Sequence, residues 1–149
     1  MRTFALVLAS VWLVSAGPAW AADTIGLVKT VGGTAVVVTG SERVPAAVGT
    51  PVHQDDVIET GADGSVGVTF KDNTTMSIGP DTKLAVDEFV YAPEQEKYGF
   101  RTRMVQGTLF YVSGTIAKLA PEAVSVATPV GTIGIRGTRF LVKVDAASR

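Results

Sequence analysis

Apolar residues recur at every second position in much of the chain, and this period of two restricts the possible folds more than any other feature. Successive side chains of a β-strand point to opposite faces, whereas the apolar face of a helix repeats every 3.6 residues. We find no amphipathic helical pattern after residue 24. The segments that show strand-like patterns are residues 36–38, 57–58, 66–70, 84–86, 89–91, 109–112 and 124–126. Their β-branched composition predicts an all-β protein.

Turn-forming residues separate these segments at short intervals. Gly, Pro, Asp and Asn favour tight turns because each suits a turn conformation or bonds back to nearby backbone. The expected turns lie at residues 32–33, 61–64, 72–73, 79–81 and 93–94, and we interpret 72–73 as a hairpin turn. This spacing favours a single compact domain of short strands, arranged as a sandwich, a roll or a β-solenoid.

The N-terminus has the three parts of a secretory signal peptide. Arg2 supplies a positive charge, residues 4–14 are apolar, and Ala19-Trp20-Ala21 forms a small-x-small cleavage site. The apolar part is shorter than the roughly 20 residues of a membrane-spanning helix, and no later segment could span a membrane. We therefore expect residues 1–21 to be removed, leaving one domain at 22–149 that is periplasmic or secreted.

The segment 128–144 changes the phase of its apolar alternation. Ile133 and Ile135 are odd-numbered, whereas the alternating apolar residues Phe140, Val142 and Val144 are even-numbered. A shift of one residue moves side chains to the other face of a sheet. We therefore expect a bulge or a sharp bend near Gly137, where a strand turns a corner.

Arg136 and Arg139 flank this bend and are candidate partner-binding residues. A planar guanidinium beside glycines can reach a carboxylate or a carbonyl with two hydrogen bonds. In a purely structural role, the arginines would hold nearby backbone carbonyls or pair with acidic residues such as Asp55, Asp56 or Glu59. Both roles are compatible with the sequence.

Two segments share the pattern Gly-Thr-x-Phe-x-Val, at residues 107–112 and 137–142. The similarity suggests two strands that begin from similar turns and face similar layers. Two copies are too few to establish a repeat architecture.

Catalytic, metal and cofactor sites are not indicated. The chain has no Cys, a single His and no Gly-x-Ser-x-Gly motif, so nucleophilic catalysis has no recognisable basis. His53 lies near Asp55-Asp56, but a metal normally needs three or four converging ligands, and we interpret this stretch as a solvated turn. Asp87 and Glu88 are adjacent on an expected strand, so one of them should face away from any shared site. We expect no enzyme activity, metal or cofactor.

Nucleic-acid binding is not indicated either. The formal net charge is −1, and the basic residues are scattered along the chain. A nucleic-acid-binding protein usually carries a concentrated basic surface.

Aromatic residues in the second half of the chain offer a different kind of binding site. An exposed aromatic surface for a glycan or a protein could be formed by Tyr91, Tyr98, Phe100 and Tyr111, with rings that stack on sugar faces. Tyr91 and Tyr98 are the candidate partner-binding residues among them. Packing in the core or at a sheet edge is the alternative use of these rings. A carbohydrate or cell-wall binding module is therefore the alternative function.

The order of several motifs resembles that of the FecR-type domain family. The C-terminal part has Thr128-Pro129 followed by Arg-Gly-Thr-Arg-Phe at 136–140 and an apolar strand. Motifs nearer the N-terminus follow the same order as in this family. They are Gly33-Thr34, Val48-Gly49, the segment Asp55 to Thr60, the segment Val68 to Met76 and the segment Met104 to Leu109. The resemblance covers nearly all of the chain after residue 24.

This resemblance implies an exported, non-catalytic module that recognises a protein or transmits a signal in the bacterial cell envelope. Its expected partner is an envelope or outer-membrane protein. The regulators of the family carry signals from an outer-membrane transporter through a membrane helix to a sigma-factor-binding segment. This chain shows neither a membrane helix nor a cytoplasmic segment, so we do not carry the sigma-regulating role over to it.

Overall fold

Twelve strands within residues 22–147, the part of the chain that the computed structural model describes, form one continuous sheet. The predicted signal peptide lies outside the described residues. Neighbouring strands are antiparallel, except that β9 and β10 run parallel. The prediction of an all-β domain is confirmed.

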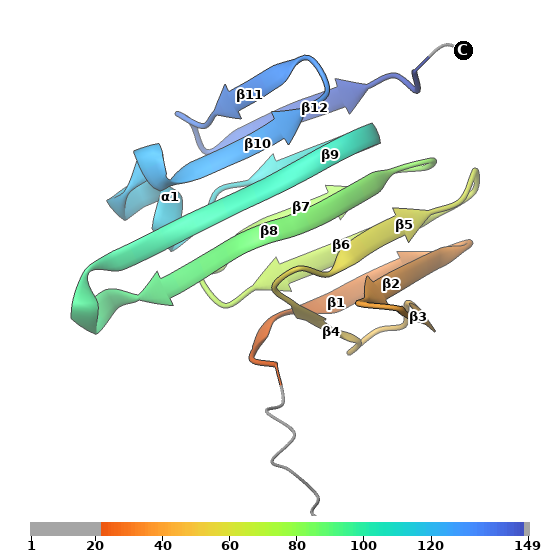
Figure 1. Cartoon of the computed structure of the whole chain (residues 1–149), viewed down its shortest axis with the longest axis horizontal. Coiled ribbons are helices and arrows are strands. Elements are labelled where there is room, and N and C mark those ends of the chain that lie inside the picture. Colours follow the sequence, from red (N-terminus) through yellow and green to blue (C-terminus); the bar gives the residue numbers. More distant parts are fainter. Residues whose placement is uncertain (1–21, 148–149) are drawn as a thin grey trace, which may run out of the picture.

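The sheet curls so that its two halves face each other (Figure 1). In spatial order, the front half contains β3 (Glu42–Pro45), β2 (Ala35–Thr39), β5 (Val57–Thr60), β8 (Lys83–Ala92), the first part of β9 (Lys97–Val112), β10 (Val124–Thr128) and β11 (Gly131–Gly134). The back half contains β4 (Pro51–His53), β1 (Thr24–Gly32), β6 (Ser65–Phe70), β7 (Thr75–Ile78), the last part of β9 and β12 (Arg139–Val144). Short helical segments are α1 (Thr115–Leu119) and the 3₁₀ turns Pro93–Gln95 and Pro121–Ala123.

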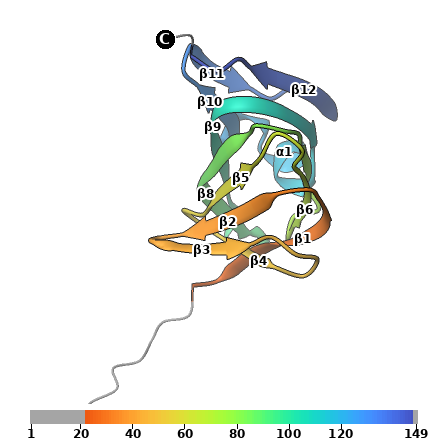
Figure 2. The same cartoon turned by 90° about the vertical axis from the view of Figure 1, so that its right-hand side faces the viewer.

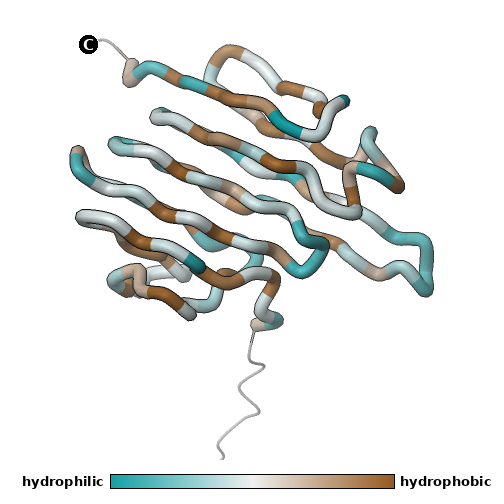
Figure 3. The backbone as a smooth tube through the Cα atoms, turned by 180° about the vertical axis from the view of Figure 1, so that it is seen from behind, coloured by the Kyte–Doolittle hydropathy of each residue, from teal (hydrophilic) through white to brown (hydrophobic). Residues whose placement is uncertain are grey.

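The inner faces of the two halves meet in one apolar core. Seen from the side, β9 passes over from one half to the other, so the sheet forms a half-barrel, which corresponds to the roll among the three predicted arrangements (Figure 2). Along β6, Val66, Val68 and Phe70 are buried, whereas the residues between them are not. Hydrophobic and hydrophilic residues also alternate along the strands seen from behind (Figure 3). The period of two thus identified the inward-facing side chains.

Aromatic rings connect the two ends of this core. Phe70, Phe89 and Phe100 form a cluster with ring centroids 4.8–5.8 Å apart. The Tyr111 ring lies 6.2 Å from Phe100 and stacks on Phe140 at 4.7 Å. Burial raises the pKa of the Tyr111 phenol well above its ordinary value of 10.0. Phe100 and Tyr111 are core residues and offer no exposed ring for a ligand.

Glycine and threonine build the corners at which the chain passes between the two halves. The Thr60 hydroxyl donates a hydrogen bond to the Gly79 carbonyl at 2.7 Å and accepts one from the Thr82 backbone N–H at 2.9 Å. The Thr82 hydroxyl in turn accepts a hydrogen bond from the Thr108 N–H at 3.0 Å. Threonine hydroxyls therefore satisfy backbone groups that the corners remove from the sheet ladder. The turns predicted at 61–64 and 79–81 coincide with these corners.

Asp87 and Glu88 lie on the same face of the sheet, contrary to the expectation from their adjacency. The register of β8 against β9 shifts between Val86 and Glu88, so Asp87 occupies a β-bulge. A bulge places one extra residue opposite the partner strand and breaks the strict alternation of faces. Asp87 Oδ1 accepts a hydrogen bond from Arg103 at 3.1 Å, and Glu88 Oε2 accepts one from Arg101 Nε at 2.6 Å. Both carboxylates are engaged in ion pairs on the outer surface.

The turn at Asp72-Asn73 is a hairpin, as predicted, but Asp72 also supports the helix that the sequence analysis missed. Asn73 has a φ of 66°, a left-handed backbone conformation that asparagine adopts readily in tight turns. The Asp72 carboxylate is fully buried and accepts hydrogen bonds from the Thr74 N–H, the Thr74 hydroxyl and the Ile116 N–H. Helix α1 is only five residues long, so it has too few turns to produce a helical periodicity.

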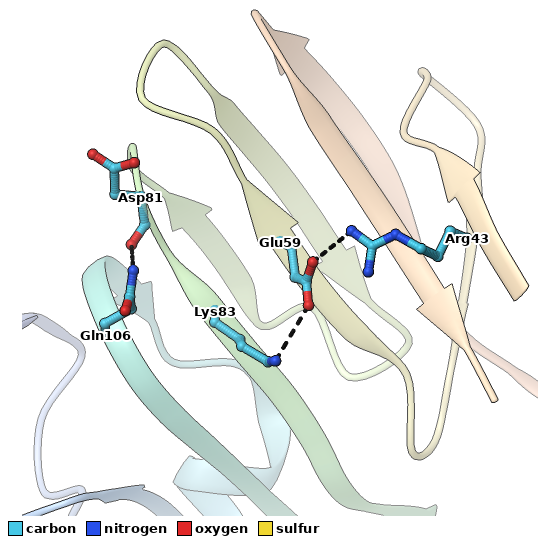
Figure 4. A network of polar contacts seen from close by, with 5 residues as sticks. All are labelled: Arg43, Glu59, Asp81, Lys83 and Gln106. Atoms are coloured by element: carbon cyan, nitrogen blue, oxygen red, sulfur yellow. Dashed lines mark hydrogen bonds and ion pairs between the residues drawn. The ribbon is translucent and has the colours of Figure 1, made fainter. Parts of the chain in front are cut away.

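A three-residue ion network crosses the outer surface of the front half (Figure 4). Glu59 contacts Arg43 at 2.7 Å and Lys83 at 3.4 Å. The hydrogen bond from Arg43 is the main reason that the pKa of Glu59 lies below its ordinary value of 4.5; partial burial opposes it and Lys83 assists it. In the same view, the Gln106 side chain donates to the Asp81 carbonyl at 3.0 Å.

We expect this network to contribute to stability at neutral pH and to lose its contribution in acid. Because folding lowers the pKa of Glu59, its contribution is present above pH 4.5 and disappears as the pH falls through the lower folded-state pKa. Glu59→Gln should cost less than about 1 kcal/mol at pH 7, as is usual for solvent-accessible pairs. Urea unfolding of both proteins at pH 7 and pH 3 checks this, and a difference that grows in acid would contradict it.

Candidate binding surface

The two halves of the sheet separate beyond β9 and leave the roll open at one end. The β10–β11 hairpin extends the front half, and β12 extends the back half along the last part of β9 (Figure 1). Within residues 22–147, β11 pairs with β10 alone and β12 pairs with β9 alone. Each of these two strands therefore has one edge without a strand partner in the described structure. We call this region, formed by residues 128–145, the open end.

Apolar side chains extend from the core into the open end. A groove of about 690 Å³ runs between the β10–β11 hairpin and β12, and Val105, Val130, Ile133, Val142 and Val144 contribute to its lining. Val130 is 97% exposed. A neighbouring recess of about 400 Å³ is lined by Arg136, Arg139 and the residues between Phe140 and Lys143. The open end thus combines apolar surface with exposed basic side chains.

The structure places both predicted arginines at the edge of this surface. Arg136 lies in the loop between β11 and β12, Arg139 is the first residue of β12, and both side chains are exposed. Neither forms an ion pair with another residue in the described range. Two of the alternative partners named above are engaged elsewhere, since Asp56 contacts His53 and Glu59 contacts Arg43.

The expected bend near Gly137 is a break between two strands that belong to different halves of the sheet. The Ser113 N–H donates to the Thr138 carbonyl at 2.9 Å, and its hydroxyl donates to the Gly137 carbonyl at 2.7 Å. Ile135, before the break, is buried, as is Val142 after it. The change of phase therefore keeps apolar side chains inside on both sides of the bend.

The two similar segments, 107–112 and 137–142, lie side by side, but their equivalent residues do not face the same way. β12 pairs with the last part of β9, and Phe140 lies opposite Tyr111. Phe140 packs against the core, whereas Phe110, its counterpart in the pattern, is 41% exposed on the outer face. The prediction of similar layers is wrong because Gly107 is a corner inside β9, whereas Gly137 lies in the loop before β12.

Tyr91 and Tyr98 are positioned as a cross-strand pair and line neither the groove nor the recess. They lie opposite each other on β8 and β9, near the hairpin that joins these strands, with ring centroids 6.4 Å apart. Both side chains are half-buried and pack against the core. The structure therefore does not bring the tyrosines together with the arginines.

The stretch around His53 differs from the solvated turn that we expected. Asp56 is 1% exposed, and its Oδ2 atom accepts a hydrogen bond from the His53 N–H at 2.7 Å and lies 3.2 Å from His53 Nδ1. Asp55 has a φ of 69°, so a turn is present. In the described part of the chain, no group of three or more His, Cys, Asp or Glu side chains is arranged to hold a metal ion.

Signals for the open end were only partly present in the sequence. The glycines and the phase change marked the bend and its arginines, but the groove depends on the separation of β11 from β12.

None of the helices at 22–147 is both long and apolar enough to cross a membrane.

Comparison with protein families places the open end within the segment that a family model matches. The family described as FecR protein matches residues 56–149, which include β5 to β12 and both candidate arginines. Searches among curated proteins and solved structures found no match. Because the match spans more than half of the sequence and agrees with its ordered motifs, the chain belongs to the FecR protein family.

Proposed function

We propose that this chain is an exported, non-catalytic module that recognises another protein in the bacterial cell envelope. Membership of the FecR family supports a signalling-related role there. The observation that carries the proposal is the open end, where two strand edges that have no strand partner within residues 22–147 lie beside an apolar groove and two exposed arginines.

Strand edges and arginines are suited to binding an extended protein segment. An exposed edge can form main-chain hydrogen bonds with an added strand, while side-chain pockets provide specificity. Arginine often contributes strongly to protein interfaces because its guanidinium makes several directed hydrogen bonds. Leu141 and Val130, at 65% and 97% exposure, supply apolar surface next to these groups.

No catalytic step forms part of this proposal. FecR is a regulatory and signalling family. The single histidine, His53, lies against the buried Asp56. Arg43, Arg101 and Arg103 pair with acidic residues on the outer surface, which leaves Arg136 and Arg139 as the arginines without an ion pair within residues 22–147.

The proposal predicts that one envelope protein is captured through the open end. The tagged chain is mixed with solubilised cell envelope, cross-linked, purified and analysed by mass spectrometry. Arg136→Ala/Arg139→Ala should reduce capture about tenfold or more, because two interface arginines that each contribute more than about 1 kcal/mol would be lost.

The matched control is Arg101→Ala/Arg103→Ala, which removes two arginines from a different surface. This control should retain capture, and circular dichroism should show that both variants are folded. Equal loss in both variants would contradict a specific role for the open end. If the parent chain enriches no protein, protein recognition itself is refuted and glycan binding through Tyr91 and Tyr98 becomes the hypothesis to test.

A further inference from the structure

The free edge of β12 has a charge pattern that defines the kind of strand it can accept. Arg139, Leu141 and Lys143 alternate along β12 and are exposed on its outer face. Phe140 and Val142 alternate with them and face inward, toward the core. The outer face of this edge therefore presents a basic, an apolar and a basic side chain in succession, from Arg139, Leu141 and Lys143.

The neighbouring strand does not neutralise these two basic residues. Across β9, Arg139 lies opposite Val112, Leu141 opposite Phe110 and Lys143 opposite Thr108. Lys143 Nζ lies 3.5 Å from Asp145 Oδ1, but both side chains are more than 70% exposed. Such a solvent-accessible contact is weak and can be exchanged for another carboxylate.

A second copy of the chain is a poor occupant of this edge. If two β12 strands paired antiparallel about Leu141, Arg139 of one copy would lie opposite Lys143 of the other. Like charges in directly opposite positions destabilise a strand pair, and basic residues at free edges commonly prevent self-association. An acidic strand would instead find a favourable partner at both positions.

We infer that the free edge of β12 binds an extended acidic segment of the partner protein as an added antiparallel strand. Two carboxylates on the segment lie opposite Arg139 and Lys143, and an apolar residue lies opposite Leu141. The intervening side chains face the groove and are apolar, because Val142 and Val144 line it. This inference rests on the proposed protein-recognition function and specifies the chemistry of the partner.

The groove explains why the occupant is a strand with two different faces. Its lining includes apolar residues from both halves of the sheet, such as Ile133 from β11 and Val144 from β12. An added strand beside β12 would cover these side chains with one face and meet the basic residues with the other. An acidic chain without alternating apolar residues would satisfy only the charges.

The test uses two short fluorescent peptides with the full chain. One peptide has two glutamates separated as Arg139 and Lys143 are, with valines between them, and the other has lysines in place of the glutamates. Fluorescence anisotropy should show binding of the glutamate peptide about tenfold tighter than that of the lysine peptide, because two cross-strand charge pairs change sign. Arg139→Glu/Lys143→Glu should reverse this preference.

A control variant, Lys29→Glu/Lys97→Glu, makes the same change in net charge at two exposed lysines outside the open end. It should retain the preference for the glutamate peptide. Equal binding of the two peptides, absence of binding, or equal effects of the two charge-reversal variants would overturn the inference. If envelope capture survives Arg139→Glu/Lys143→Glu, the β12 inference fails while protein recognition stands; if the parent captures no envelope protein, the proposed function itself fails.

Discussion

Replacing Gly107 by alanine is expected to lower the free energy of unfolding by about 3 kcal/mol or more. Gly107 lies at the corner where β9 passes from the front half of the sheet to the back half. Its φ of 108° is unfavourable for any residue with a Cβ atom. An added Cβ would also lie 2.1 Å from the Thr82 hydroxyl oxygen and 2.4 Å from Thr82 Cα.

The steric clash of an added Cβ at Gly107 cannot be relieved without a large loss of stability. Thr82 is buried, and its hydroxyl accepts a hydrogen bond from the Thr108 N–H. Moving Thr82 would therefore disturb the corner and expose or unpair polar groups. Rotating the backbone of Gly107 would instead separate the two halves of β9, which hold the whole sheet together.

Urea unfolding of Gly107→Ala, followed by circular dichroism, measures this effect. Gly134→Ala is the matched control, since no described atom outside the adjacent residues would lie within 4 Å of its new Cβ and its φ is outside the left-handed range. We expect the control to change stability by less than about 1 kcal/mol. Equal stability of Gly107→Ala and the parent would show that β9 does not turn at this glycine.

Removing the carboxylate of Asp72 is expected to cost about 3 kcal/mol. Asp72→Ala leaves the buried N–H groups of Thr74 and Ile116 without their acceptor, and each unsatisfied buried donor costs about 1–3 kcal/mol. The second of these groups belongs to the first turn of α1, so the helix also loses the acceptor of one of its N-terminal N–H groups. Asp72→Asn should fall between the parent and the alanine variant, because its amide retains one acceptor oxygen.

Denaturant unfolding of the two Asp72 variants tests this role, with Asp145→Ala as the control. Asp145 is an exposed aspartate in contact with Lys143, so its loss should change stability by less than about 1 kcal/mol. A similar small change in Asp72→Ala would mean that water satisfies the donors and that Asp72 is not required to hold α1.

Local sequence patterns were informative wherever the physical cause was local. Alternation identified the inward side chains of β6, and the turn residues at 79–81 marked a real corner. They failed at Asp87, because a bulge depends on the register between β8 and β9. They also failed to distinguish Asp72 from an ordinary turn residue, because its hydrogen-bond partner Ile116 lies 44 residues later.

At the candidate binding surface too, the sequence predicted the features with a local cause and missed those that depend on strand pairing. The glycines and the phase change pointed to Arg136 and Arg139, and the exposure of both side chains keeps them available as candidates. Their relation to the groove could not be predicted, because β11 and β12 are close in sequence but extend different halves of the sheet. The same topology places Tyr91 and Tyr98 outside the groove and the recess, since both tyrosines pack against the core.

The sequence by itself determined the all-β class, the main turns, the inward-facing positions and the family, because all of these depend on residue order and on the two-residue period of a strand. Only the tertiary structure decided that β9 belongs to both halves of the sheet, that Asp72 accepts a hydrogen bond from a distant helix and that β12 presents a basic edge without a strand partner in the described residues. These features depend on which strands pair across the sheet, and pairing is settled by the joint burial of side chains that are distant in sequence.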